Sequence, residues 1–127
     1  MYPTYLARIT STAEKACAIA MDRPKDVHAR ERLFDALAQV ADPTFQGDDP
    51  ELAHLKPLFG QAQVWAGIVR TRITGLRIDK RGHPAVQAIQ HPVRDLLPIL
   101  SDLRRELEMV HRDNLNDEAQ TRQQNGR

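Results

Sequence analysis

Cysteine is nearly absent from this chain of 127 residues, because Cys17 is the single example. One cysteine excludes an internal disulfide framework and fits a reducing compartment such as the cytoplasm. Aromatic residues make up only 5% of the chain, and no apolar run approaches the length of a membrane span. A net charge of +1 gives no overall attraction to nucleic acid or to a membrane. We therefore expect a cytoplasmic protein with an aliphatic core.

The clearest positive feature is an apolar stripe near the carboxyl end, with intervals of three and four residues throughout. Its members are Val86, Ile89, Val93, Leu96, Leu100, Leu103, Leu107 and Val110. This spacing is typical of a helix that packs lengthwise against other helices. Because the stripe covers about three heptads, more than one short core helix needs, it predicts burial shared either with the rest of this chain or with another copy of it. The residues expected at that oligomer interface are Leu96, Leu100, Leu103, Leu107 and Val110.

Three further helices are expected, over residues 4–21, 26–41 and 57–74. Each shows apolar residues at helical spacing, and in the first these are Leu6, Ile9, Ala13, Ala16 and Ala20. Trp65 is predicted to be the largest core side chain of the third helix. Residues 42–50 contain two prolines, a glycine and three aspartates, which is typical of a loop. Asp48 or Asp49 is expected to cap a short turn that begins at Pro50.

A connector near residues 75–82 separates the third helix from the final stripe. Gly75 is expected to end the helix, residues 76–78 alternate like a short strand, and residues 79–82 resemble a turn. Pro92 and Pro98 predict an interrupted final segment, with a short helix from Pro84 and a longer, kinked helix from Pro92.

The sequence therefore predicts an all-α protein: a bundle of four to five helices with a hairpin-like connector, which forms oligomers through its helices. Residues 1–112 are expected to form a single helical domain. Residues 113–127 are polar and cannot bury enough apolar surface to order themselves, so they are expected to form a flexible tail.

No constellation of residues predicts an enzyme. The five histidines do not show a metal-ligand spacing, and the chain lacks a nucleophile elbow or a glycine-rich phosphate loop. Cys17 lies on an alanine-rich apolar stripe and is expected to be a buried, inert thiol. We therefore expect neither catalysis, nor a cofactor, nor a bound metal.

A basic stretch is the most suggestive polar feature of the sequence. Within residues 70–81 a single acid, Asp79, accompanies five cations: Arg70, Arg72, Arg77, Lys80 and Arg81. Cations at the end of a helix and on the following turn can reach successive phosphates, so these five are candidate nucleic-acid contacts. The alternative is that they neutralise the carboxyl end of the third helix.

The order of elements over residues 55–107 also resembles a known family. A helix containing Trp65, the connector of residues 75–82, the step His83-Pro84-Ala85-Val86 and a leucine-rich helix follow one another. This order is similar to that of the helical small terminase subunits of tailed bacteriophages. The chain departs from the family where residues 105–109 continue the helix in place of a Gly-Leu-Thr-Pro turn, and in lacking a recognisable helix-turn-helix.

The resemblance implies a role in viral DNA packaging. The protein would form a ring-like homo-oligomer in the host cytoplasm, bind double-stranded DNA and present it to the large terminase subunit, with no active site of its own. A different class of function also fits the residues: a small cytoplasmic helical adaptor or antiactivator that binds another protein through its apolar stripe and binds no nucleic acid. A third hypothesis is that the protein is a dimeric DNA-binding regulator.

Overall fold

The computed structural model describes the backbone of residues 2–45, 49–78 and 83–125, and the side chains of residues 4–45, 49–76 and 89–113. Four α-helices and one 3-10 helix follow one another along this part of the chain. They are α1 (Tyr2–Asp22), α2 (Val27–Val40), η1 (Pro50–Leu55), α3 (Lys56–Ile78) and α4 (His83–Asn125). These residues contain no strand, which confirms the predicted all-α architecture.

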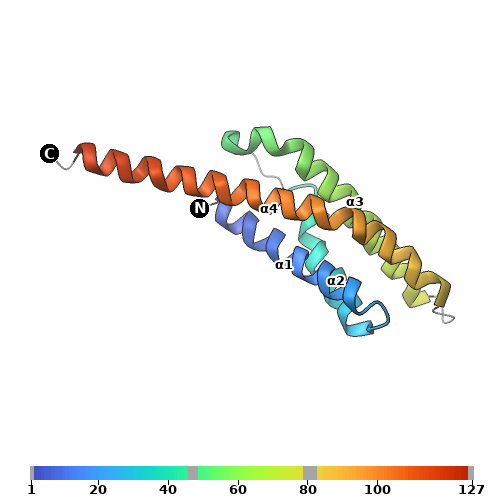
Figure 1. Cartoon of the computed structure of the whole chain (residues 1–127). Coiled ribbons are helices and arrows are strands. Elements are labelled where there is room, and N and C mark those ends of the chain that lie inside the picture. Colours follow the sequence, from blue (N-terminus) through green and yellow to red (C-terminus); the bar gives the residue numbers. More distant parts are fainter. Residues whose placement is uncertain (1, 46–48, 79–82, 126–127) are drawn as a thin grey trace.

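The four α-helices form a ring of packed pairs (Figure 1). Helix α1 packs on α2 and on α4, and α3 packs on the same two helices, while η1 contacts α3 and α4. Each α-helix therefore packs against two neighbouring helices and buries its apolar face between them, as the helical spacing of apolar residues predicted. The arrangement confirms a four-helix bundle.

Carboxylate side chains cap the beginnings of two helical elements. Asp26 Oδ1 accepts hydrogen bonds from the backbone N–H of His28 at 2.9 Å and of Ala29 at 3.3 Å, and so caps α2. Asp49 Oδ1 accepts from the backbone N–H of Glu51 at 3.0 Å and caps η1. The structure thus selects Asp49 from the two caps that the sequence offered for this turn.

The leucine stripe of α4 lies inside the subunit. Four of the five residues predicted to form an oligomer interface have 0% exposure and belong to the core of the single chain: Leu96, Leu100, Leu103 and Leu107. Val110 is partly buried against the same core. Because α4 packs along both α1 and α3, the length of the stripe is accounted for within one subunit. These four side chains therefore present no surface to a second copy.

The largest core side chain is Phe59 rather than Trp65. Phe59 is fully buried, and its ring meets that of Phe45 edge-to-face with 5.3 Å between the centroids. Trp65 is only partly buried and packs against the edge of the core. The prediction for Trp65 was wrong because the inward stripe of α3 runs through Phe59, Ala62 and Ala66.

The prolines of α4 do not divide it, which corrects the expectation of two helices. Pro92 and Pro98 both lie inside one helix that begins at His83. Each proline removes a backbone hydrogen bond and costs about 3 kcal/mol in a helix interior. The apolar stripe stays on one face of the helix before and after each proline. Packing of that face against α1 and α3 therefore offsets the lost stability.

The structure also differs from the sequence prediction at both ends of the final segment. Residues 76–78 continue α3 and are not a strand, so Gly75 does not end that helix, while residues 79–82 lie outside the described part of the chain. At the other end, α4 continues to Asn125 and extends beyond the other helices (Figure 1), where an unstructured tail was expected. Extending a helix that is already formed needs no new nucleation.

We expect Leu100→Ala to lower the free energy of unfolding by about 2–5 kcal/mol, because it leaves a cavity in a fully buried site. Denaturant unfolding followed by circular dichroism measures this change. Met109→Ala on the same helix is the control, since Met109 is 52% exposed and its loss should change stability by less than about 0.5 kcal/mol. A Leu100→Ala variant with parental stability but a smaller mass in solution would contradict burial within one subunit.

Candidate binding groove between α1 and α2

The predicted basic patch is only partly available at the surface. Arg70 is half-buried and tied to α2: its guanidinium carbon lies 4.1 Å from the centroid of the Phe34 ring, and its Nε donates to the Phe34 carbonyl oxygen at 3.2 Å. A cation held over an aromatic face and hydrogen-bonded to a carbonyl is engaged in the fold. Arg70 therefore joins α3 to α2.

Of the other four residues of that patch, Arg72 alone has its side chain in the described part of the chain. Arg72 is exposed on α3. Arg77 belongs to the helical backbone of α3, but its side chain lies outside the described residues, and so do Lys80 and Arg81 entirely. Their contact with nucleic acid stays a prediction.

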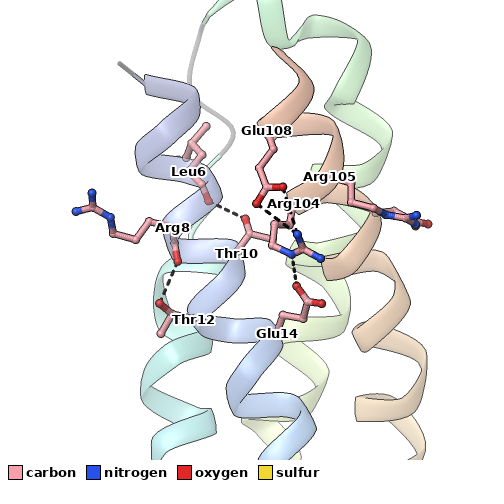
Figure 2. Close-up of polar contacts among 9 residues, drawn as sticks. Leu6, Arg8, Thr10, Thr12, Glu14, Arg104, Arg105 and Glu108 are labelled. Carbon is pink, nitrogen blue, oxygen red and sulfur yellow. Dashed lines mark hydrogen bonds and ion pairs between the residues drawn. The ribbon is translucent and has the colours of Figure 1, made fainter. Parts of the chain in front are cut away.

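An ion pair joins α1 to α4 on another side of the bundle (Figure 2). Arg104 Nε donates to Glu14 Oε2 at 2.6 Å, and Arg104 Nη1 lies 3.3 Å from the Glu108 carboxylate. The hydrogen bond that Arg104 donates to the Glu14 carboxylate is the main reason that the pKa of Arg104 is raised, so this guanidinium stays charged. Further along the same pair of helices, Thr4 Oγ1 lies 3.0 Å from His111 Nδ1. These polar contacts fix how α1 lies along α4.

The Cys17 thiol is buried, with 0% exposure, as the sequence predicted. Burial, reinforced by the carboxylate of Glu14, raises the pKa of the Cys17 thiol from 9.0 to about 12. Because the thiolate is the nucleophilic form, the burial and the raised pKa both lower the reactivity of this thiol.

A groove of about 710 Å³ runs along the outer surface between α1 and α2. Twelve residues from the two helices line it: Tyr5, Arg8, Ile9, Thr12, Lys15, Ala16, Ile19, Ala29, Arg32, Asp35, Ala36 and Gln39. Half of these side chains are apolar. The groove is therefore the candidate binding surface of the subunit.

Small side chains explain why the groove is not filled. Ala16 of α1 and Ala29 and Ala36 of α2 all line it, and three alanines leave space that larger side chains would occupy. Tyr5 and Ile19 mark the ends of the lining on α1 and are 52% and 44% exposed. They are separated by 14 residues of one helix, which corresponds to about 21 Å along its axis.

Cations dominate the charge along the groove. Arg8 and Lys15 come from α1 and Arg32 from α2, and all three side chains are exposed. Asp35 is the one carboxylate in the lining. The groove thus combines an apolar floor with cations on both of its walls.

Sequence reasoning identified only part of this surface. Leu6, Ala13 and Ala20 are buried as their spacing predicted, whereas Ile9 and Ala16 of the same predicted stripe are partly exposed and line the groove. The signal in the sequence that could have indicated the groove was the presence of large apolar residues outside the inward stripe of the first helix. The stripe alone does not tell which part of it a neighbouring helix covers.

A second groove, of about 670 Å³ between α1 and α4, is less suited to binding. Its lining includes Glu14, Arg104 and Glu108, which are already engaged with one another. A partner there would have to displace these contacts, which a partner between α1 and α2 would not.

Comparisons with protein-family models, with curated proteins and with solved structures find no significant match to this chain. In the part of the chain that the structure describes, no helix is both long enough and apolar enough to cross a bilayer. The same residues contain no cluster of three His, Cys, Asp or Glu side chains suited to a metal ion. Function therefore has to be inferred from the groove itself.

We expect the parent protein to lose stability relative to Cys17→Ala as the pH rises from about 9 toward 12. In this range the unfolded thiol releases its proton while the folded thiol keeps it, so stability falls by about 1.4 kcal/mol per pH unit. Denaturant unfolding of both variants across this range measures the difference, which should be constant below pH 9. A difference that does not vary with pH would show that Cys17 titrates normally in the folded protein.

Proposed function

We propose that this chain is a non-enzymatic helical adaptor that binds a protein partner in the groove between α1 and α2. The observation that carries the proposal is the groove itself, half of whose lining side chains are apolar and whose α1 lining ends at the exposed side chains of Tyr5 and Ile19. The four leucines of the α4 stripe, Leu96, Leu100, Leu103 and Leu107, are fully covered within the subunit. The adaptor surface is therefore placed on α1 and α2 instead of on that stripe.

The shape of the groove favours a helix as the bound element. A furrow between two packed helices accepts the apolar ridge of a third helix, as in helix-in-groove recognition. Its length of about 21 Å matches a helix of about 14 residues. Such a helix would cover Ile9, Ala16 and Ile19 and add a third layer to the α1–α2 pair.

A non-enzymatic role is supported by what the reactive groups do in the fold. Cys17 is buried and keeps its proton. Arg104 and Glu14 hold α1 on α4, and Arg70 holds α3 on α2. These groups stabilise contacts between helices, whereas the groove offers apolar surface and charge suited to binding.

We expect Ile19→Asp to weaken binding of a helical peptide by about tenfold or more, because a carboxylate would be buried against apolar side chains. The probes are stapled helices of about 14 residues, with leucines at helical spacing and flanks of Glu, Gln or Lys. Isothermal titration and amide chemical shifts measure affinity and location, and the strongest-binding member is used to compare variants.

Val64→Asp is the matched control, since Val64 is 62% exposed on α3, away from the groove. It should leave peptide affinity unchanged. Equal losses for Ile19→Asp and Val64→Asp, or no binding by any of the peptides, would contradict the adaptor proposal.

The second candidate is the viral DNA-packaging role that the resemblance to small terminase subunits implies. It is supported by that resemblance over residues 55–107 and by the concentration of cations in residues 70–81. In this role copies of the chain assemble, bind double-stranded DNA and present it to the large terminase subunit. Because Arg70 is engaged with Phe34, DNA contacts would fall on the later cations of the stretch, Arg77, Lys80 and Arg81.

For the packaging role, replacing Arg77, Lys80 and Arg81 by Gln should weaken duplex binding at low salt by about tenfold or more. The slope of log affinity against log salt should also fall by about 2–3, because up to three phosphate contacts are lost. The control replaces three other cations by Gln: Lys25, Arg94 and Arg112. Unchanged DNA binding in the first variant, together with a monomeric mass by light scattering, would contradict this role.

A further inference from the structure

The charges around the α1–α2 groove identify the kind of helix it fits. We propose that the partner is an amphipathic helix whose apolar ridge is flanked by Asp and Glu residues, an inference that rests on the proposed adaptor function. The groove places three exposed cations beside an apolar floor: Arg8, Lys15 and Arg32. The lining supplies one opposing carboxylate, Asp35.

The positions of these cations fit acidic residues on both sides of a bound ridge. Arg8 and Lys15 lie seven residues apart on α1, which places them two turns, or about 10 Å, apart on one face. Arg32 stands on α2, on the opposite wall. A bound helix with two acidic residues two turns apart on one flank, and one acidic residue on the other flank, would place a carboxylate beside each of the three cations.

The side chains of these cations also contribute to the apolar surface. Long basic residues lay their methylene stems along apolar neighbours and keep the charged group in water. Around Ile9 and Ala16 the stems of Arg8 and Lys15 therefore extend the walls of the groove. Each cation then contacts the partner's ridge and attracts its acidic flank.

Other carboxylates near α1 do not neutralise the groove. Glu14 is bonded to Arg104 on the side of α1 that faces α4. Asp42 accepts hydrogen bonds from the backbone N–H and the hydroxyl of Thr44, which lower its pKa, and it lies outside the lining. The positive character of the walls therefore remains available to a partner.

Shape favours a helix over the other anionic surfaces. Duplex DNA presents phosphates and no apolar ridge, so the floor lined by Ala16 and Ile19 would stay uncovered. A flat bilayer surface would leave the floor of a concave groove unfilled. A helix with an apolar ridge and acidic flanks fills the floor and satisfies the walls together.

The test compares the three stapled peptides, which differ only in flanks of Glu, Gln or Lys. The Glu peptide should bind about tenfold more tightly than the Gln peptide, and the Lys peptide should bind most weakly. The difference should shrink as salt rises from about 50 to 500 mM, because exposed ion pairs are screened. Circular dichroism of the free peptides confirms that their helicity is equal.

The charge-reversed variant Arg8→Glu/Lys15→Glu/Arg32→Glu should reverse the order and prefer the Lys peptide. The matched control reverses three exposed cations outside the groove, Lys25, Arg94 and Arg112, and should keep the preference for Glu. Thermal unfolding of both triple variants shows whether each is folded. If the first is not, the single variants Lys15→Glu and Arg94→Glu are compared in the same way.

The outcomes separate this inference from the proposed function. Equal affinity for the Glu and Gln peptides, with binding still lost in Ile19→Asp, would overturn the acidic-partner inference and leave the adaptor function standing. No binding by any of the peptides would overturn both. Binding to phosphatidylglycerol vesicles that displaces the Glu peptide would assign the cations to a lipid surface and overturn the inference.

Discussion

The burial of one apolar stripe on α4 is the constraint on which the rest of the fold depends. Within the described residues α1 and α3 do not pack on each other, and α4 contacts both. The fully buried leucines of the stripe, such as Leu100 and Leu103, therefore hold α1 and α3 together on one side of the bundle. Helix α2 closes the ring on the opposite side.

This constraint explains why α4 continues as one helix although its local sequence contains two prolines. Pro92 and Pro98 each weaken the helix, yet the helix continues because tertiary contacts on both sides stabilise it. The polar contacts then set how α1 lies against it, with Arg104 bonded to Glu14 and His111 near Thr4. Apolar packing supplies the stability of this interface, and the charged and polar groups define its alignment.

The side of α1 that lines the groove with α2 differs from its buried side, and the proposed function follows from this difference. Against α4 the helix presents residues that become fully buried, such as Ala13 and Cys17. Against α2 the small side chains of Ala16, Ala29 and Ala36 leave a groove whose cations remain in water. A single helix thus contributes one face to the core and another to the surface on which binding is proposed.

The sequence by itself determined the helical class, the spans of the first two helices and a cap at Asp48 or Asp49, because periodicity and capping are local properties. Only the tertiary structure decided which surface covers each stripe. The sequence cannot distinguish whether Leu96 faces its own core or another copy of the chain, because both environments favour the same apolar side chain. The α1–α2 groove is likewise a product of how two helices pack, and no residue pattern within one helix contains that information.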